Sequence, residues 1–376
     1  MGIRSGRLHD AVTQGELTAV EAQLSSIDTQ LAQIDQQLYV RLYNQDTGLR
    51  KYRSAVAKIK SGTVQISNAC FIGDSITEGV GVTGAENRYT KGFVGIIRTA
   101  LTTLLGDVGS GMVPVYAVDG VNAWTFSAGW ENNTFGIAAE AKSTSTINET
   151  AQISFNGTGI VFVVLKSASR GNVSVAIDGG APTVLSCNAA VTAQGTISVT
   201  GLGAGDHTAI LTNAEAKSVT ISGAYAIKGT TGIRVNMVGR SGASAATFTA
   251  TDFTLAASID VFSPVLTVIG VITNEIGSSV AIATFTEKVQ AIITRAKTFG
   301  DVIILADNLR SDVAAGVQAP YVQALKDLAD TNGCVLVDIY SRWGLLGNTL
   351  GLMTDTLHPN EAGHQDIAEA LMDVMT

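Results

Sequence analysis

Three polar residues at two distant places in the chain have the types and spacing needed for nucleophilic catalysis. Ser75 lies in the segment GDSITEG, directly after an apolar run that is typical of a strand. Asp355 and His358 lie three positions apart in DTLHPNEAGH, just before a helical pattern. A serine hydroxyl becomes a useful nucleophile when an imidazole takes its proton and a carboxylate holds that imidazole. This combination of residues is that of a serine activated by an Asp–His pair.

Of the four histidines, His358 is the one expected in a strand-end loop of the α/β part of the chain. His9 lies in the N-terminal tail, His207 lies in a β-rich segment, and His364 lies within a predicted helix, where we expect it at the surface. Structural roles stay open for the same segments. A residue of the Gly-Asp-Ser turn could cap a helix, and His358 could be an ordinary loop residue beside a proline.

A parallel sheet is expected to position these residues. Apolar strands that alternate with helices form a sheet covered on both faces, and ligands bind at the carboxyl ends of its strands. The sequence therefore predicts a three-layer, flavodoxin-like α/β fold built from residues 61–124 and 231–376. Strand patterns occupy 64–75, 233–238, 259–273, 301–307 and 334–340, and helical patterns occupy 92–105, 284–300, 321–333 and 361–375.

Residues 125–230 have a different character. They are rich in Thr, Ser, Gly, Val and Ala, and their short alternating runs are separated by Gly, Asn and Asp. Such spacing without helical periodicity predicts an all-β sandwich or jelly roll inserted into the α/β domain.

The N-terminal region carries a heptad pattern over residues 17–42. A narrow apolar stripe on a polar helix favours association with identical helices, and leucine at one core position with β-branched residues at the other favours more than two strands. We expect a parallel homotrimeric coiled coil here, or else an amphipathic helix packed on its own domain. Residues 1–16 form a tail, residues 43–62 look like a basic connector, and the stalk with its connector spans 17–60. The heptad residues are Leu17, Val20, Leu24, Ile27, Leu31, Ile34 and Leu38.

The composition excludes several classes of function. The formal net charge of −8 argues against a nucleic-acid partner, because phosphate binding needs a basic surface. The N-terminus has no apolar signal segment, and no run of about 18 uncharged apolar residues predicts a membrane span. Cys70, Cys187 and Cys334 are widely spaced and are expected to be buried core thiols. We expect no metal and no organic cofactor, because the histidines are dispersed.

The two reactive segments together resemble sequence blocks of the GDSL/SGNH hydrolase family. FIGDSITEG is similar to the first block of that family, and DTLHPNEAGH is similar to its last block, Asp-x-x-His-Pro before a helix. The blocks occur in the family's order at the two ends of the predicted α/β domain. The resemblance implies that Ser75 is the nucleophile, His358 the general base and Asp355 its orienting group.

The same resemblance implies an oxyanion hole made by three groups. These are the Ser75 backbone N–H, a glycine of the second block and an asparagine of the third. The segment VGRSGASAATF resembles the second block, so Gly242 is the expected glycine, with Gly239 as the weaker choice. The third block of the family is Gly-x-Asn-Asp, whereas residues 272–275 read Ile-Thr-Asn-Glu, so that Asn274 matches and its neighbours do not.

The β-rich segment also carries a resemblance. Residues 201–213 (GLGAGDHTAILTN) resemble the Gly-Leu-x-x-Gly-x-His run of jelly-roll domains attached to carbohydrate esterases, which implies sugar binding. A spacer or capping role is the alternative. Trp124, at the entry to this segment, and Asp74, beside the nucleophile, are further candidates for substrate contact.

These features together predict a serine esterase that removes acyl groups, chiefly acetyl, from a carbohydrate such as a bacterial surface polysaccharide. With a trimeric stalk, the architecture resembles a phage tail fibre or tailspike, and its N-terminus would then attach to a virion. The alternative is a non-catalytic glycan-binding or receptor-binding fibre protein that keeps the hydrolase scaffold.

Overall fold

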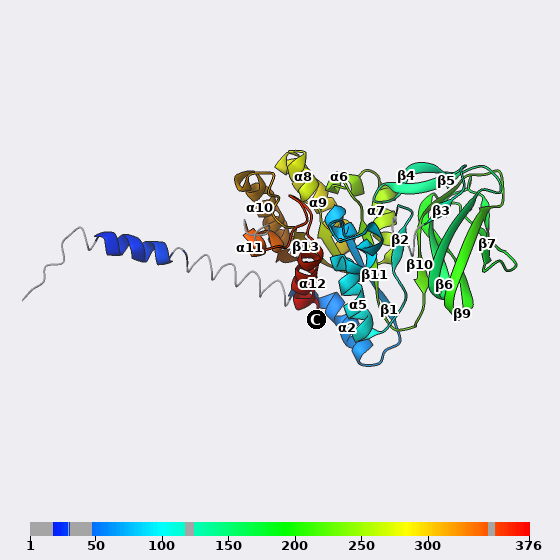
Figure 1. Cartoon of the computed structure of the whole chain (residues 1–376), viewed down its shortest axis with the longest axis horizontal. Coiled ribbons are helices and arrows are strands. Elements are labelled where there is room, and N and C mark those ends of the chain that lie inside the picture. Colours follow the sequence, from blue (N-terminus) through cyan, green and yellow to red (C-terminus); the bar gives the residue numbers. More distant parts are fainter. Residues whose placement is uncertain (1–17, 29, 31–46, 117–123, 345–349) are drawn as a thin grey trace, which may run out of the picture.

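The computed structural model describes residues 18–28, 30, 47–116, 124–344 and 350–376. At its centre lies a parallel five-stranded sheet in the order β11-β1-β12-β13-β14 (Figure 1). Because β1 lies between β11 and β12 and all strands run the same way, the residues that follow these three strands meet at one edge of the sheet. The strands are β1 (Ile66–Gly73), β11 (Gly232–Gly239), β12 (Leu266–Gly270), β13 (Asp301–Ala306) and β14 (Val335–Asp338).

The side chains of β1 alternate between two buried layers, as a sheet covered on both faces requires. Ala69 and Phe71 belong to one core, and Cys70 and Ile72 belong to the other. The first core contains side chains of α2 (Arg50–Lys60), α5 (Phe93–Leu105) and α12 (Glu361–Met375). The second contains side chains of α6 (Ala245–Phe248), α7 (Asp252–Ser258), α9 (Ile282–Lys297) and α10 (Ala315–Asn332).

The predicted parallel sheet and its covering helices are thus confirmed, with shifts at the ends of elements. The largest difference lies in residues 259–273, which we expected to be one long strand. Only Leu266–Gly270 forms β12, because Asp260–Phe262 is a turn of 3-10 helix that ends at Ser263 in a left-handed conformation. The three cysteines are buried and free, as expected.

The chain between α5 and β11 forms a second sheet of nine strands that pair antiparallel (Figure 1). Its two longest strands, β6 and β9, pair with each other along most of their length. The sandwich or jelly-roll assignment stays a prediction. The strands are β2 (Met112–Pro114), β3 (Thr125–Phe126), β4 (Glu131–Ile137), β5 (Glu140–Thr144), β6 (Thr150–Lys166), β7 (Asn172–Ile177), β8 (Thr183–Ser186), β9 (Ala193–Asn213) and β10 (Val219–Ile227).

The antiparallel sheet contacts the α/β part at the turn between β4 and β5. The Ala138 backbone N–H donates to the Ser258 hydroxyl of α7 over 3.1 Å, and the Ala138 carbonyl accepts from the Arg240 guanidinium over 2.6 Å. Phe135 of β4 also meets Phe253 of α7 edge-to-face. Arg240 directly follows β11, so this turn lies beside the loop that we expected to contain the oxyanion-hole glycine.

Helix α2 corrects our interpretation of residues 43–62 as a connector. Leu49, at its N-cap, and Tyr52 are completely buried, and Ile59 is nearly so. The Tyr52 backbone N–H donates to the Asp301 carboxylate of β13 over 2.9 Å. The many basic residues made the segment look polar throughout, although its buried positions recur with helical spacing on the face toward the sheet. Helix α2 is therefore part of the α/β layers, and residues 43–46 lie outside the described residues.

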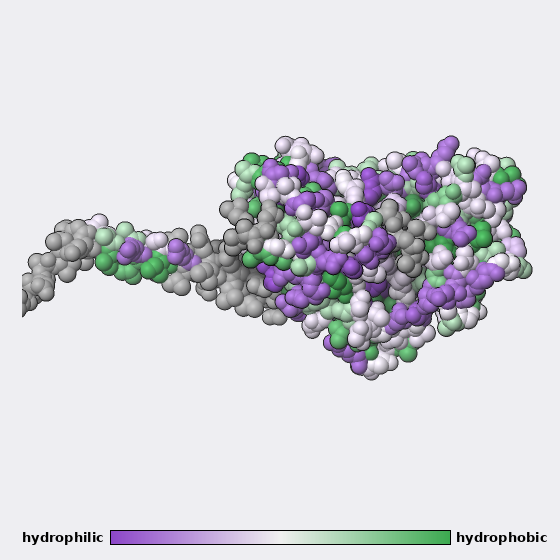
Figure 2. All heavy atoms as spheres, viewed as in Figure 1, coloured by the Kyte–Doolittle hydropathy of each residue, from purple (hydrophilic) through white to green (hydrophobic). Residues whose placement is uncertain are grey.

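The described residues of the predicted coiled coil are helical at 18–28. Val20, Leu24 and Ile27 are each about half exposed on this helix, and Figure 2 shows hydrophobic atoms along one of its sides. The other heptad positions, together with the tail at 1–16, lie outside the described residues. None of the described helices is long and apolar enough to span a membrane.

His364 is completely buried in α12, which corrects the surface position that we expected. Its Nδ1 accepts from the Phe93 backbone N–H over 3.3 Å, and its Nε2 lies 3.1 Å from the Val80 carbonyl, to which it donates. The neutral ring therefore joins α12, α5 and the loop after α3. Burial lowers the pKa of His364 to about 4.

The replacement His364→Gln is expected to destabilise the protein more at pH 7.5 than at pH 4.5. An unfolded histidine has a pKa near ~6.5, so between that pH and about 4 the unfolded chain holds a proton that the folded chain lacks. The stability due to neutral His364 is full above this window and falls by up to about 3 kcal/mol as the pH drops through it. Urea unfolding of both proteins over a pH series measures the difference. A difference that does not change with pH would contradict the prediction.

Candidate active site

Glycines at the strand ends let a short helix fold directly onto the sheet. Gly73 of β1 pairs with Gly239 of β11. A Cβ on Gly73 would lie 1.9 Å from the Thr77 hydroxyl, so a larger residue would push the following helix away. That helix is α3 (Ser75–Glu78), and Ser75 is its first residue. The backbone N–H of a first helical residue has no acceptor within the helix, so it is free to receive a developing negative charge.

The structure brings Ser75, His358 and Asp355 together as the sequence analysis expected. His358 Nε2 lies 3.0 Å from Ser75 Oγ, and His358 Nδ1 lies 2.8 Å from Asp355 Oδ2. These distances allow a continuous chain of hydrogen bonds from the carboxylate to the hydroxyl. The arrangement matches the geometry in which an imidazole takes a proton from serine while a carboxylate stabilises the resulting cation.

Asp355 is held by its own loop as well as by the imidazole. Its Oδ1 accepts from the backbone N–H groups of Leu357 and His358, each over 2.7 Å. Burial by itself would raise the pKa of Asp355, but the hydrogen bonds from the His358 ring and from the two N–H groups outweigh burial and lower it. Asp355 therefore stays ionised, and half of its side chain remains exposed, so this side of the site is open to solvent.

Asp74 has a structural role, which corrects our expectation that it contacts substrate. Its carboxyl is completely buried; one oxygen accepts from the Ile76 backbone N–H over 2.9 Å, and the other accepts from the Thr273 hydroxyl. Asp74 is the N-cap of α3, and through Thr273 it also binds the start of α8 (Thr273–Gly277). It fixes the helix that carries Ser75.

The expected oxyanion-hole residues lie on a loop and on a short helix at the same sheet edge. Gly242 follows β11, is exposed, and has a φ of +76°, a conformation that favours glycine. The weaker candidate, Gly239, is enclosed, because a Cβ there would lie 2.5 Å from the Glu78 backbone N. Asn274 of α8 donates one amide N–H to the Ala243 carbonyl over 2.8 Å. A side-chain amide carries two N–H groups, so one of them is left for another acceptor.

Two glutamates that the sequence analysis did not select clamp the loop around Gly242. Glu78 of α3 accepts from both the backbone N–H and the hydroxyl of Ser241, each over 2.5 Å. Glu275 of α8 accepts from the Ala245 backbone N–H over 2.6 Å. Glu275 stands where the family pattern has aspartate, and this departure was the one sequence signal that could have identified it.

Three buried carboxyl groups lie beneath the site, namely Asp74, Glu275 and Asp307, and each is at most 2% exposed. Burial raises the pKa of Asp74 to about 6 and that of Glu275 to about 7. For Asp307, burial and repulsion by the other two carboxylates raise the pKa well above its ordinary value. Neither oxygen of Asp307 has a hydrogen-bond partner among the described residues. A protonated Asp307 carries no charge, so it reduces the negative charge below Ser75. Such a charge would repel the oxyanion that forms at Ser75.

Trp124 lies in the region of the antiparallel sheet, and its contacts differ from those of the site described above. Its indole N–H donates to the Val113 carbonyl over 3.2 Å, and its ring stacks on Phe126. These contacts are those of a packing residue, so they do not support the substrate contact that we expected of Trp124.

His207 forms a separate pair, with its Nδ1 2.7 Å from Asp178 and its Nε2 2.9 Å from the Gly203 carbonyl.

The comparisons with known proteins bear on the fold of the domain that contains this site. The model of the GDSL-like Lipase/Acylhydrolase family matches residues 203–365. This range is less than half of the chain; it contains Asn274, Asp355 and His358, and excludes Ser75, which lies before the insert. No curated protein sequence matched the chain.

Among solved structures, "Peptidoglycan O-acetylesterase in action, 5 min" is similar with a TM-score of 0.64 and 14% identity. The match covers 86% of this chain and 96% of that one. The α/β part of this chain has the GDSL/SGNH hydrolase fold. The lipase/acylhydrolase from Enterococcus faecalis matches with a TM-score of 0.35 and 16% identity, covering 38% of this chain and 76% of that one.

In the α/β domain, the replacement Glu275→Ala is expected to lower kcat for p-nitrophenyl acetate by at least about tenfold, with little change in KM. Loss of the Glu275 carboxyl leaves the Ala245 N–H without its acceptor and loosens the contact between the loop at Gly242 and α8, which contains Asn274. Because a single oxyanion donor is worth about 10²–10³ in rate, this loosening should slow the reaction. Glu275→Gln keeps an acceptor of the same shape and should retain most of the activity. Equal activities of the two variants would show that the clamp does not position the site.

Proposed function

We propose that this protein is a serine carboxylic ester hydrolase. The observation that carries the proposal is the hydrogen-bonded series Asp355–His358–Ser75, with heavy-atom distances of 2.8 and 3.0 Å. A helix cap needs no imidazole, and a loop histidine needs no serine partner, so neither structural alternative explains the whole series. The GDSL/SGNH fold of the surrounding domain supports the same reaction class.

The geometry suggests a two-step acyl transfer. Ser75 Oγ attacks the ester carbonyl while His358 Nε2 accepts its proton, and Asp355 stabilises the imidazolium that forms. The oxyanion is received by the Ser75 backbone N–H, the loop at Gly242 and the second amide N–H of Asn274. His358 then returns the proton to the leaving alcohol. In the second step it takes a proton from water, which attacks the acyl-serine and releases the acid.

We further propose that the substrate is an acylated carbohydrate, chiefly an O-acetylated one. The similar structure with a TM-score of 0.64 is that of a peptidoglycan O-acetylesterase, which supports this class by likeness of fold alone. The half-exposed Asp355 side chain supports it by geometry, because a site open to solvent can admit one ester of a long polymer. The adjoining β4–β5 turn, bound to Arg240, would form one wall of such a site.

The test is hydrolysis of p-nitrophenyl acetate and then of acetylated glycans by the wild type and by Ser75→Ala. The variant should lose at least about 10³-fold in kcat while its thermal unfolding is unchanged, because the nucleophile is removed without a change in packing. Ser61→Ala, at the exposed end of α2, is the matched control and should be fully active. If wild type is inert on every ester, the chain is better described as a glycan-binding protein on a hydrolase fold.

We also propose that residues 17–42 associate as a homotrimeric coiled coil, as in a fibre that could attach to a virion by its N-terminus. The half-exposed Val20, Leu24 and Ile27 support association, because a single chain leaves this apolar stripe in water.

Light scattering should therefore give wild type a mass about three times the 38.9 kDa of one chain. Leu24→Asp should dissociate the oligomer, because it places a charge in the stripe. Ser26→Asp adds the same charge on the polar face and should leave the mass unchanged. A monomeric wild type, or equal effects of the two variants, would refute the proposal.

A further inference from the structure

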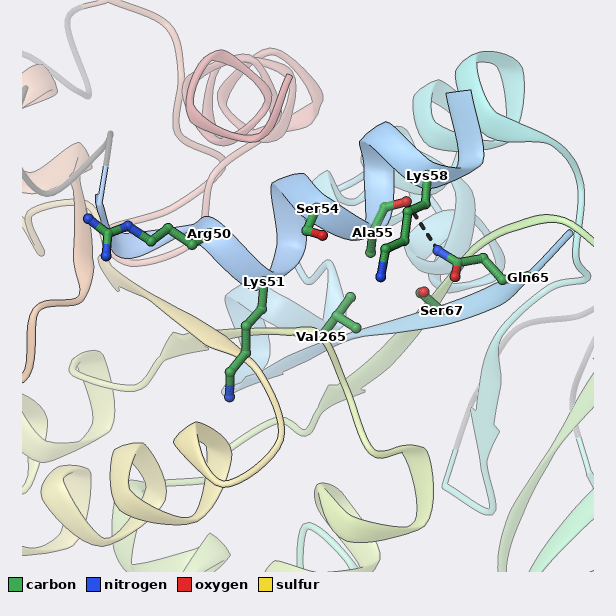
Figure 3. Close-up of a pocket in the computed structure, with 8 residues that line it drawn as sticks. All are labelled: Arg50, Lys51, Ser54, Ala55, Lys58, Gln65, Ser67 and Val265. Carbon is green, nitrogen blue, oxygen red and sulfur yellow. Dashed lines mark hydrogen bonds between the residues drawn. The ribbon is translucent and has the colours of Figure 1, made fainter. Parts of the chain in front are cut away.

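A cavity of about 410 Å³ lies between α2 and the amino end of the parallel sheet (Figure 3). Its walls come from α2, from the start of β1, and from Val265 just before β12. Strand β1 has 8 residues. At about 3.3 Å per residue, the strand separates this cavity from Ser75 by roughly 25 Å. The cavity is therefore distinct from the candidate active site at the opposite edge.

Two of the three cationic side chains that line the cavity have no acceptor among the described residues. Figure 3 shows Lys51 and Lys58 extending from α2 on the side that faces β1, with Arg50 at the outer end of the helix. The side chains of Arg50 and Lys58 form no ion pair or hydrogen bond in the described part of the chain. The Lys51 ammonium has a long contact of 3.4 Å to the Phe299 carbonyl and a charge interaction with Asp301.

Two serine side chains line the cavity, one buried and one exposed. Ser67 of β1 is 9% exposed, and its hydroxyl has no partner among the described residues. The Ser54 hydroxyl of α2 faces the same space, also without a described partner. Both hydroxyls border the cavity beside lysines and are free to bond a ligand there, because a serine hydroxyl can donate to an acceptor oxygen.

The charge of this region is opposite to that of the whole protein. Helix α2 has the sequence RKYRSAVAKIK, with basic residues in its first and last turns and no acidic residue, whereas the chain has a net charge of −8. Asp301 is the neighbouring carboxylate. It accepts from the Tyr52 backbone N–H and interacts with the Lys51 charge, while burial raises its pKa. Unpaired cations and hydroxyl donors around one cavity attract an anionic group with several acceptor oxygens.

We propose that this cavity is a second binding site, which receives a carboxylate or phosphate group of an acidic glycan through Lys51, Lys58, Ser54 and Ser67. The glycan assignment rests on the proposed function, whereas the anion site itself does not. An acidic chain would otherwise repel an acidic polymer, so a local basic cavity gives the enzyme a contact that is remote from the reacting ester. Binding there would add affinity at a repeated surface ligand.

The experiment is calorimetric titration of the full-length chain with polygalacturonate, with a glycerol phosphate polymer, and with dextran as the neutral control. The double variant Lys51→Gln/Lys58→Gln should bind the preferred acidic polymer at least about tenfold more weakly than wild type, because two charge-assisted contacts are lost. Lys60→Gln/Lys166→Gln makes the same change in net charge outside the cavity and should bind like wild type. The polymer that binds more tightly identifies the group as carboxylate or phosphate.

Three results would overturn the proposal: no binding of either acidic polymer by wild type, equal loss in both double variants, or tighter binding of a DNA duplex through the same lysines. Hydrolysis of p-nitrophenyl acetate is measured in parallel and should be unchanged in the cavity variant. A wild type that binds the acidic polymer but hydrolyses no ester would refute the proposed function and leave the anion site intact.

Discussion

The hydrogen bond between His358 and Ser75 is the contact on which the candidate site depends, and it joins residues 283 positions apart. A 3.0 Å bond between side chains so distant in sequence requires that both ends be rigid. Ser75 is fixed because glycine at the end of β1 allows α3 to rest on the sheet, and because the buried Asp74 caps that helix. His358 is fixed because its loop leads into α12, whose His364 is buried against α5 and the loop after α3.

The rigidity of this edge depends on buried polar groups that would be costly if they were left unpaired. Asp74 and Thr273 connect α3 to α8, while Glu275 and Glu78 hold the loop at Gly242 from two sides. Burying acids so close to a forming oxyanion is electrostatically unfavourable. The raised pKa values of Glu275 and Asp307 indicate how the fold reduces this cost, since a protonated carboxyl carries no charge.

The antiparallel sheet is joined to the α/β part at the rim of the same edge. The carbonyl at Ala138 binds Arg240, which directly precedes the loop with Gly242. The insert therefore contacts the chain only a few residues from the expected oxyanion donors. The His207–Asp178 pair and the Trp124–Phe126 stack lie within the insert itself, so the rim contact at Ala138 is a feature through which the insert could influence the site.

The sequence alone determined the elements and the reactive pair of segments. Apolar strands alternating with amphipathic helices specify a parallel sheet, because no other arrangement buries both faces of each strand. The spacing of Asp355 and His358 is local, so their contact could be expected from a tight turn. The expectation for α2 failed because charged residues concealed its buried face, which is defined only by the sheet it packs against.

Only the tertiary structure decided which segments that are distant in the sequence come into contact. Asp74 was a candidate for substrate contact, and His364 was expected at the surface of its helix. Both are buried, because burial depends on which elements pack over a residue and not on its neighbours in the chain. The clamp by Glu275 and the donors that gather in the cavity at α2 arise in the same way, since each joins residues whose proximity is set by the packing of α8 and α2 on the sheet.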